Sequence, residues 1–336
     1  MTLRESDIRP DELRSRLAEA ASADARWLAR RVGSFVLVPC PACQCVEQET
    51  AMQKEGMTWR RCLACGTLYV SPRPDEDLLA RYYARSESYR FQNAVLFPAS
   101  AAARAERIFA PRARRCEELC ERMGLGRGLT LVEVGPGFGL FAQEVRKLGR
   151  FSRIVVVEPV PELAATCRAL GVEVVESTVE RAGLPDGMAD VVVSFECIEH
   201  MFSVAGFFEA CLRVLRPGGL FVVTCPNGEG FDISILGSRS GTVNHQHLNL
   251  FNTRSLPYLA RRCGFEVLDV TTPGELDVEL VRREVLAGRF DLDDRPFLRW
   301  VLMDEWGRIG GAFQRFLADN GMSSHMWMAA RRPEAS

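Results

Sequence analysis

Three closely spaced glycines are the residues of this chain best suited to binding a cofactor. A short apolar run leads directly into Gly135, Gly137 and Gly139. Glycines at the end of a strand let a ligand approach the backbone because no Cβ stands in the way, and the helix that follows presents free N–H groups. A second apolar run ends on Glu158, whose carboxylate could accept both hydroxyls of a ribose. The spacing predicts a nucleoside-containing cofactor on an open α/β sheet.

The glycine spacing differs from the dinucleotide fingerprint G-x-G-x-x-G, which makes a nicotinamide enzyme the weaker interpretation. Four motifs in this order resemble the class I S-adenosylmethionine-dependent methyltransferases: E-V-G-P-G-F-G, V-V-V-E-P, D-V-V-V-S-F-E-C-I-E-H and L-R-P-G-G. The resemblance covers residues 128–270. It implies an α/β fold, a Rossmann-like doubly wound sheet whose last strand runs antiparallel at the sheet edge.

The same resemblance implies S-adenosylmethionine as the cofactor and assigns residues to each of its parts. Glu133 and the three glycines would surround the methionine part, and Glu158 would hold the ribose. Ser177 or Thr178 would contact the adenine, and the residues at the end of the fourth strand would lie beside the sulfonium. The full set of implied cofactor residues is Glu133, Gly135, Gly137, Gly139, Glu158, Pro159, Ser177, Thr178, Phe195 and Glu196.

Four cysteines near the N-terminus form two C-x-x-C pairs. Cys40 and Cys43 are separated by 18 residues from Cys62 and Cys65. Two such pairs on a short hairpin fit a tetrahedral zinc site, and four thiolates leave no open position for catalysis. The pattern therefore predicts a structural zinc ion in a ribbon. Cys45 is a further thiol near this site, and a pair formed by Cys43 and Cys45 is an alternative to the Cys40–Cys43 pair.

A histidine pair is the strongest candidate for proton transfer. Methyl transfer to a hydroxyl or an acidic carbon needs a base, and histidine suits this at neutral pH. The segment H-Q-H-L-N-L-F is similar to an H-E-H-L-S-Y-F-type stretch of sugar C-methyltransferases, which act on nucleotide-linked deoxysugars and also carry an N-terminal zinc-binding part. The resemblance implies His247 as the base, with His245 second. Gln246 departs from the glutamate of that pattern, and both histidines could instead settle the loop or cap the next helix.

A third histidine belongs to the segment E-C-I-E-H. Glu196, Glu199 and His200 within five residues could hold a divalent ion such as Mg²⁺. Quinone O-methyltransferases show a similar arrangement, whereas in many metal-free relatives these residues shape the floor of the pocket. His200 is therefore a further catalytic candidate.

Composition limits the class of protein. The chain has 336 residues, 47% of them hydrophobic, and a net charge of −2, which argues against a general nucleic-acid binder. No window approaches 18 uninterrupted apolar residues, and the N-terminus has no apolar signal core. Most cysteines outside the pairs fall in helix or strand patterns. We expect a reduced, cytoplasmic protein with no membrane span, and its oligomeric state stays open.

The chain divides by pattern into four parts. These are an N-terminal helix (1–34), a zinc ribbon (35–74), a helical linker or lid (75–127), and a methyltransferase domain (128–336) with a helical insertion (275–320).

The expected activity is methyl transfer to a hydroxyl or carbon of a sugar or similar small metabolite. The acceptor could carry a phosphate or nucleotide, which arginines at 104–115 or Arg239 would meet. Three alternatives stay open at this point: an RNA methyltransferase, since some of those enzymes also carry a four-cysteine ribbon; a natural-product or quinol O-methyltransferase; and a non-catalytic cofactor-binding partner.

Overall fold

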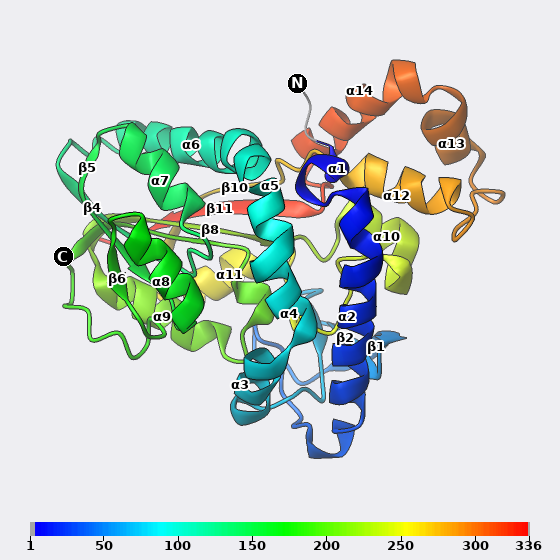
Figure 1. Ribbon diagram of the computed structural model, residues 1–336, viewed down its shortest axis with the longest axis horizontal. Helices are drawn as coiled ribbons and strands as arrows, with labels where there is room; N and C mark the ends of the chain where they lie inside the picture. Colours follow the sequence, from blue (N-terminus) through cyan, green and yellow to red (C-terminus); the bar gives the residue numbers. More distant parts are fainter. Residues whose placement is uncertain (1–3, 335–336) are drawn as a thin grey trace.

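A seven-stranded sheet forms the centre of the molecule in a computed structural model that describes residues 4–334 (Figure 1). Its strand order is β10-β11-β8-β7-β4-β5-β6. All neighbouring pairs are parallel, except that β11 runs antiparallel to both β8 and β10. The strands are β4 (Leu129–Val134), β5 (Phe151–Val157), β6 (Glu173–Val175), β7 (Ala189–Phe195), β8 (Leu215–Pro226), β10 (Glu266–Thr271) and β11 (His325–Arg331). The predicted doubly wound sheet with an antiparallel last strand is confirmed.

The continuous apolar runs of the sequence arise because the sheet is covered on both faces. Along β7, Val191 and Val193 pack into one core with Phe141, whereas Val192 packs into the other with Phe208. The helices of the first core are α6 (Ala110–Arg122), α7 (Leu140–Lys147) and α8 (Pro161–Ala169), and those of the second are α9 (Val204–Val214) and α11 (Ser255–Arg262). The strand order reverses between β4 and β7, which places the expected ligand site at the carboxyl ends of these two strands.

A second, four-stranded sheet joins the cysteine-rich segment to the centre of the molecule. Its order is β1-β2-β3-β9. The strands are β1 (Gln48–Lys54), β2 (Met57–Cys62), β3 (Leu68–Val70) and β9 (Asn249–Leu250), and η1 (Val32–Ser34) precedes them. The pair between β3 and β9 aligns Leu68 with Leu250 and Tyr69 with Asn249. The ribbon is therefore hydrogen-bonded through its backbone to the segment that follows His247.

Helices from the first third of the chain extend from beside the ribbon toward the large sheet (Figure 1). They are α1 (Glu5–Ile8), α2 (Asp11–Ala29), α3 (Glu76–Arg85), α4 (Glu87–Phe91), the π-helical η2 (Gln92–Leu96), α5 (Phe97–Arg104) and the π-helical η3 (Ala105–Phe109), which continues into α6. Helix α3 begins at Asp75, whose side chain accepts a hydrogen bond from the backbone N–H of Leu78 at 2.8 Å. It buries Leu78, Leu79 and Tyr82.

The segment between β10 and β11 is mainly helical. It comprises α12 (Asp277–Leu286), α13 (Pro296–Arg299), the π-helical η6 (Trp300–Asp304) and α14 (Trp306–Asp319). Three other short helices belong to loops of the central sheet: η4 (Ile198–His200), α10 (Phe231–Leu236) and η5 (Gly237–Arg239). The insertion has its own core, in which Val281, Leu302 and Leu317 pack against Phe231 of α10. The four-part division of the chain stays a prediction. Between residues 4 and 334, no helix combines the length and the apolar composition needed to cross a membrane.

Candidate active site

The glycine loop adopts a backbone conformation that side chains disfavour. Gly135, Gly137 and Gly139 have φ angles of 71°, 54° and 67°, in the left-handed region. A Cβ on Gly135 would collide with the sulfur of Cys197, whereas one on Gly137 would meet no atom within 4 Å. Gly139 directly precedes α7. The loop therefore turns tightly against β7 and leaves open space beside Gly137, where a ligand could reach the backbone.

Two buried carboxyl groups border this loop. Glu133 and Glu158 are 2% and 4% exposed, and burial raises the pKa of Glu133 to about 8 and that of Glu158 to about 7. One oxygen of Glu158 accepts from the backbone N–H of Val160 at 2.9 Å. The Oε2 atom of Glu133 has no hydrogen-bond partner in the described part of the chain. A ligand with an ammonium group and ribose hydroxyls would satisfy both groups, so the residues fit S-adenosylmethionine.

The remaining cofactor candidates lie at the same sheet edge. The backbone N–H of Glu158 bonds to Val175 O at 3.0 Å, which brings the ends of β5 and β6 together. Ser177 is half-buried just after β6, while Thr178 and Pro159 are exposed. Phe195 is packed into the core, with its ring 4.7 Å from that of Phe141.

Glu196 forms the centre of a charged cluster at the end of β7. It is a non-glycine residue with a φ of 55°, a conformation that is uncommon and often found at functional sites. Its Oε1 accepts from Arg112 at 3.0 Å and from the hydroxyl of Thr224 at 2.7 Å, and it lies 3.3 Å from His325 Nδ1. Burial raises the pKa of Glu196, but His325 and Arg112 outweigh this effect and bring the pKa to about 2.

Thr224 and His325 were missed as site residues in the sequence, although their positions carry a signal. Thr224 lies near the carboxyl end of β8 and His325 begins β11, where the two strands pair antiparallel. Ends of neighbouring strands at the point where strand order reverses are where this kind of sheet binds ligands. Arg112 belongs to the arginines of 104–115 that the sequence predicts to meet an anionic group of the acceptor, and in the structure it contacts Glu196.

His247 and His200 are held in the same way. The Nδ1 of His247 is 2.6 Å from Thr242 O, and the Nδ1 of His200 is 2.9 Å from Gln246 O. Because a carbonyl only accepts, each Nδ1 carries the proton and each neutral ring leaves Nε2 with a free lone pair. Burial and then the charge of His200 lower the pKa of His247 to about 3. Both residues are half-buried, and their ring centres lie 4.9 Å apart.

Glu199 completes this group. One donor atom each from Glu199, His200 and His247 lies within 4.8 Å of the others, whereas Glu196 is held by Arg112 and Thr224. Glu199 is 1% exposed, and its Oε2 has no partner among residues 4–334. Burial, and then the charge of Glu196, raise its pKa well above the usual range. Burial therefore favours the neutral forms of all three side chains.

His245 has a different environment from His247, only two residues away. Its Nδ1 donates to Glu55 at 2.7 Å, and its Nε2 lies 3.0 Å from the hydroxyl of Tyr82. Glu55 also accepts the backbone N–H of His245 at 3.0 Å. Both ring nitrogens are thus occupied, which suits a residue that fixes the loop better than a base. The side chain of Gln246 donates to Tyr82 and to Ser88, each at 3.1 Å.

Three tyrosines from α3 and α4 connect this loop with the cofactor edge. The ring of Tyr83 lies 5.0 Å from that of Tyr82 and 5.6 Å from that of Tyr89. The hydroxyl of Tyr83 is buried without a hydrogen-bond partner in the described residues. Burial, and then the charge of Glu158, raise the pKa of Tyr89. The predicted lid helices therefore place an unpartnered hydroxyl among the candidate site residues.

The four predicted zinc ligands converge. One sulfur each from Cys40, Cys43, Cys62 and Cys65 lies within 4.8 Å of the others, and the closest distances are 3.5 Å for Cys40–Cys65 and 3.4 Å for Cys43–Cys62. Zinc–sulfur bonds of about 2.3 Å in a tetrahedron separate the sulfurs by about 3.8 Å. The hydrogen bond from Cys40 lowers the pKa of Cys65 to about 4. Cys45 lies outside this group.

The two cysteine pairs also share one backbone geometry. Gln44 N donates to Cys40 O, and Gly66 N donates to Cys62 O, both at 2.9 Å. Gln44 and Gly66 each have a positive φ, of 63° and 75°. Such a repeated turn directs the two thiols of each pair to one point, which is what a shared metal ion requires.

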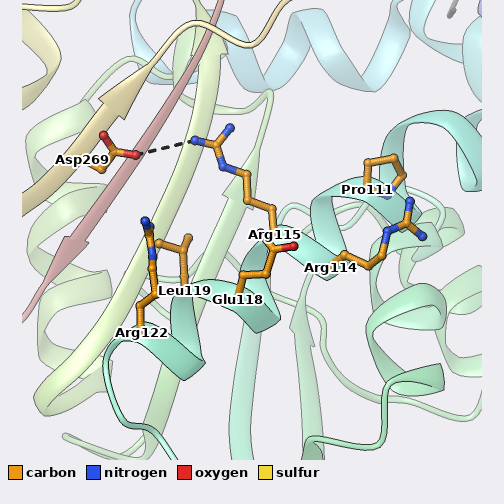
Figure 2. A pocket seen from close by; sticks show the side chains of 7 residues that line it. All are labelled: Pro111, Arg114, Arg115, Glu118, Leu119, Arg122 and Asp269. Atoms are coloured by element: carbon orange, nitrogen blue, oxygen red, sulfur yellow. Dashed lines mark ion pairs between the residues drawn. The ribbon is translucent and has the colours of Figure 1, made fainter.

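A hollow on the outer surface lies apart from all these residues. The hollow lies between α6 and β10 (Figure 2) and has a volume of about 340 Å³. Within it, Nη2 of Arg115 lies 3.7 Å from Oδ2 of Asp269. The arginine-rich helix therefore has two roles: Arg112 points toward Glu196, whereas Arg114, Arg115 and Arg122 line the outer hollow. No predicted catalytic, cofactor or metal residue lines it.

Comparison with known proteins identifies the sheet region. Residues 106–270 match the family model described as "Methyltransferase domain". A probable S-adenosylmethionine-dependent methyltransferase of Mycolicibacterium smegmatis is 34% identical over 144 residues, which cover 42% of this chain and 54% of that protein. The C-methyltransferase NovU of Streptomyces niveus is 30% identical over 166 residues, covering 47% of this chain and 38% of NovU.

An O-methyltransferase is also similar. A ubiquinone biosynthesis O-methyltransferase of a Bradyrhizobium species is 28% identical over 202 residues, covering 57% of this chain and 73% of that protein. The chain spans about half the length of the mycobacterial relatives that it matches. The similarity thus concerns the central sheet and its cofactor edge.

Proposed function

We propose that this chain, whose residues 106–270 match a methyltransferase domain, uses S-adenosylmethionine to methylate a hydroxyl or carbon of a sugar or similar small metabolite. The observation that carries this proposal is the environment of His247. Its Nδ1 is held by Thr242 O, its Nε2 is free, and it lies beside the buried carboxyl of Glu199. This geometry supports His247 as the base, because burial lowers its pKa to about 3 and so keeps the imidazole unprotonated at neutral pH.

The cofactor supplies an electrophilic methyl group on a positively charged sulfur. Glu133 would accept the ammonium of its methionine part, and Glu158 would hold its ribose. Both carboxyls are buried with raised pKa values, so a cationic ligand lowers those values and restores the charged forms. The open space beside Gly137 leaves the backbone accessible to the ligand.

His247 would take the proton of the acceptor. As the acceptor oxygen or carbon forms a bond to the methyl carbon, the bond from that carbon to sulfur breaks and the electron pair stays on sulfur. The acceptor's proton moves to Nε2 of His247. Burial lowers the pKa of His247 and so weakens this base, but an anionic oxygen bound next to Nε2 would raise the pKa again. Tyr83 could donate a hydrogen bond to that oxygen, and so could Glu199 in its protonated form, which burial favours.

The sugar-like acceptor is supported by two features. The H-Q-H segment, which resembles the H-E-H stretch of sugar C-methyltransferases, carries His247, and a relative aligned over 47% of the chain is named a C-methyltransferase, which supports carbon as the acceptor atom. The glutamate of the H-E-H pattern is replaced by Gln246, which faces Tyr82 and Ser88 instead. A carboxylate still contacts the first histidine, because Glu55 from the β1–β2 turn accepts its Nδ1–H.

The experiment is mass spectrometry of products formed from S-adenosylmethionine with a panel of nucleotide-linked sugars, quinols and RNA. A methylated sugar supports the proposal. If only RNA or only a quinol is methylated, that compound class replaces the sugar as the proposed acceptor. Tight cofactor binding without any transfer would favour a non-catalytic role.

A metal-assisted O-methyl transfer is the second candidate, favoured by the donor group of Glu199, His200 and His247. Carboxylate and imidazole ligands suit a divalent ion that could orient a diol. Dialysis against a chelator, followed by an assay of methyl transfer with and without Mg²⁺ or Zn²⁺, distinguishes the metal-assisted mechanism from catalysis by His247 alone. Loss and recovery of turnover would favour the metal, and unchanged turnover would favour the histidine acting alone.

We also propose that Cys40, Cys43, Cys62 and Cys65 hold a structural zinc ion. The prediction is that chelation exposes the ribbon and, through the pair of β3 with β9, loosens the loop that carries His247. Limited proteolysis should then cut within residues 35–75 faster than in the untreated protein. Equal cleavage rates at full metal removal would contradict a structural zinc.

A further inference from the structure

One buried carboxyl group collects hydroxyl donors from two segments that lie far apart in the sequence. Asp232, in the first turn of α10, is 1% exposed. Its Oδ2 accepts from the hydroxyl of Ser240 at 2.5 Å and from that of Thr242 at 3.1 Å. Its Oδ1 accepts from the hydroxyl of Ser324. The three donors offset the cost of burying a carboxyl group, and in return they tie both segments to α10.

The segment that contains Ser324 is a firm support for Asp232. The backbone N–H of Asp232 donates to Ser324 Oγ at 3.3 Å, in addition to the bond in the opposite direction. A Cβ on Gly230, directly before α10, would lie 2.4 Å from Cα of Ser324, so only glycine permits this close approach. Asp277, which begins α12, accepts the backbone N–H of Ser324 and, at 2.5 Å, the hydroxyl of Ser323. Asp232 is therefore fixed to the start of β11 and, through Asp277, to the helical insertion.

The other segment leads from Asp232 to His247. The backbone N–H of Thr242 donates to Ser240 Oγ at 3.1 Å, and its hydroxyl donates to Asp232. The carbonyl of the same residue accepts from Nδ1 of His247 at 2.6 Å. Because the N–H and the hydroxyl of Thr242 are both held, the residue has little freedom to turn its carbonyl away from the imidazole. Asp232 is thus connected to His247 through Ser240 and Thr242.

The loop between η5 and β9 depends on such side-chain contacts, because no helix or strand includes it. His245 is held by Glu55 from the ribbon hairpin, whereas the carbonyl that orients His247 is held from α10. A neutral imidazole can carry its proton on either nitrogen, so a base needs a neighbour that selects the tautomer. For His247 that neighbour is a backbone carbonyl whose own position is fixed by a buried carboxyl group.

We propose that Asp232 is a positioning residue for methyl transfer: through Ser240 and Thr242 it keeps the proton of His247 on Nδ1 and leaves Nε2 free for the proton of the acceptor. The proposal rests on the proposed function of His247. Asp232 acts through the loop rather than on the reacting atoms, so its replacement should change the state of the imidazole and the rate of turnover without changing the affinity for the cofactor.

The test reads the tautomer of His247 directly in the full chain. Nitrogen-15 NMR of the labelled histidines distinguishes a ring nitrogen that carries a proton from one with a free lone pair, and the chain has only four histidines to assign. We expect a single Nδ1–H tautomer in the wild type and a mixture of both tautomers in Asp232→Ala and in Ser240→Ala. Asp232→Asn, which keeps the shape and one acceptor oxygen, should lie between them and the wild type.

Ser255→Ala is the matched control for Ser240→Ala. Both serines are 0% exposed, but the hydroxyl of Ser255 accepts from the backbone N–H of Asn252 at 2.9 Å instead of contacting Asp232. This control should keep the wild-type tautomer. With a methylated acceptor in hand, kcat should fall about 10-fold or more in Asp232→Ala and Ser240→Ala, because a small misplacement of a catalytic group strongly lowers the rate. Unchanged affinity for S-adenosylhomocysteine shows that each variant is folded.

The outcomes separate this inference from the function itself. A wild-type tautomer in Ser240→Ala and Asp232→Ala, or an equal change in Ser255→Ala, would overturn the positioning role. If Asp232→Ala does not fold, Ser240→Ala alone decides. If the wild type methylates no acceptor, the proposed function fails, while the NMR spectra still show whether Asp232 sets the tautomer of His247.

Discussion

Two buried polar clusters meet at the loop 244–247, and they differ in how their atoms are partnered. The first contains Asp24, whose carboxylate accepts from the hydroxyls of Ser86 and Ser88, each at 2.7 Å, and from the backbone N–H groups of Glu87 and Ser88. It continues through Tyr82 to His245, which bonds to Glu55. We call it the bracing cluster. The second contains Glu133, Glu199, Tyr83 and His247, and we call it the open cluster.

The open cluster leaves buried polar atoms unpaired. One oxygen of Glu133, one of Glu199 and the hydroxyl of Tyr83 have no partner within residues 4–334. An unpaired buried polar atom costs about 1–3 kcal/mol, so such atoms rarely gather without a reason. The bracing cluster holds α2, α3, the ribbon hairpin and the loop together. We infer that it stabilises the fold, whereas the open cluster is completed by ligands.

Replacement of Glu158 should have the largest effect on cofactor binding. In Glu158→Ala the two ribose hydroxyls lose the carboxylate that would accept their hydrogen bonds. Because two hydrogen bonds to a charged group are lost, we expect the affinity for S-adenosylmethionine to fall by about 100-fold or more. Titration calorimetry with S-adenosylmethionine measures this. Glu173→Ala is the control, because Glu173 is paired with Arg153 on the exposed side of β6. Equal affinities in Glu158→Ala and the wild type would remove Glu158 from the site.

The pH dependence of stability tests Glu133. Its pKa in the folded, cofactor-free protein is about 8, far above that of an unfolded chain, so the folded state keeps a proton that the unfolded state releases. The contribution to stability is therefore present at low pH and is lost as pH rises through about 8. Between pH 6 and 8 we expect the cofactor-free protein to lose about 2 kcal/mol relative to Glu133→Gln. Parallel denaturant-derived stabilities for the two proteins over this range would show that Glu133 is not protonated.

A smaller effect separates two adjacent tyrosines, one from each cluster. Tyr82→Phe leaves His245 Nε2 without its partner and should destabilise the protein by about 1–2 kcal/mol. Tyr83→Phe removes a hydroxyl that has no partner and should leave the stability equal or slightly higher. Chemical denaturation measures both. The distinction between the clusters fails if Tyr83→Phe destabilises the cofactor-free protein as much as Tyr82→Phe.

Much of the sheet and its cofactor edge could be predicted from sequence because local signals are strong there. The apolar runs that end at Glu158 and Phe195 match strands β5 and β7, and the glycines require their positive φ angles. The spacing of the cysteines also predicts that their thiols converge, because the two cysteines of each C-x-x-C lie on one turn. These features depend on residues close together in the chain.

The rest depends on contacts between distant segments. Strand β9 has only two residues, and its pairing with β3 has no periodic signal in the sequence. The difference between His245 and His247 arises from Glu55 and Tyr82, which lie more than 160 residues earlier. Sequence patterns named the two histidines but could not tell which ring nitrogen is free.

The most direct test of the account is methyl transfer by the wild type and by His247→Ala. Each protein, saturated with S-adenosylmethionine, is incubated with the nucleotide-linked sugars, and methylated product is measured by mass spectrometry over time. We expect His247→Ala to bind the cofactor normally but to form product about 10²–10⁴-fold more slowly. Product formation at the wild-type rate in His247→Ala would contradict the role of His247, and no transfer by the wild type to any acceptor would contradict the assignment of the open cluster as a catalytic site.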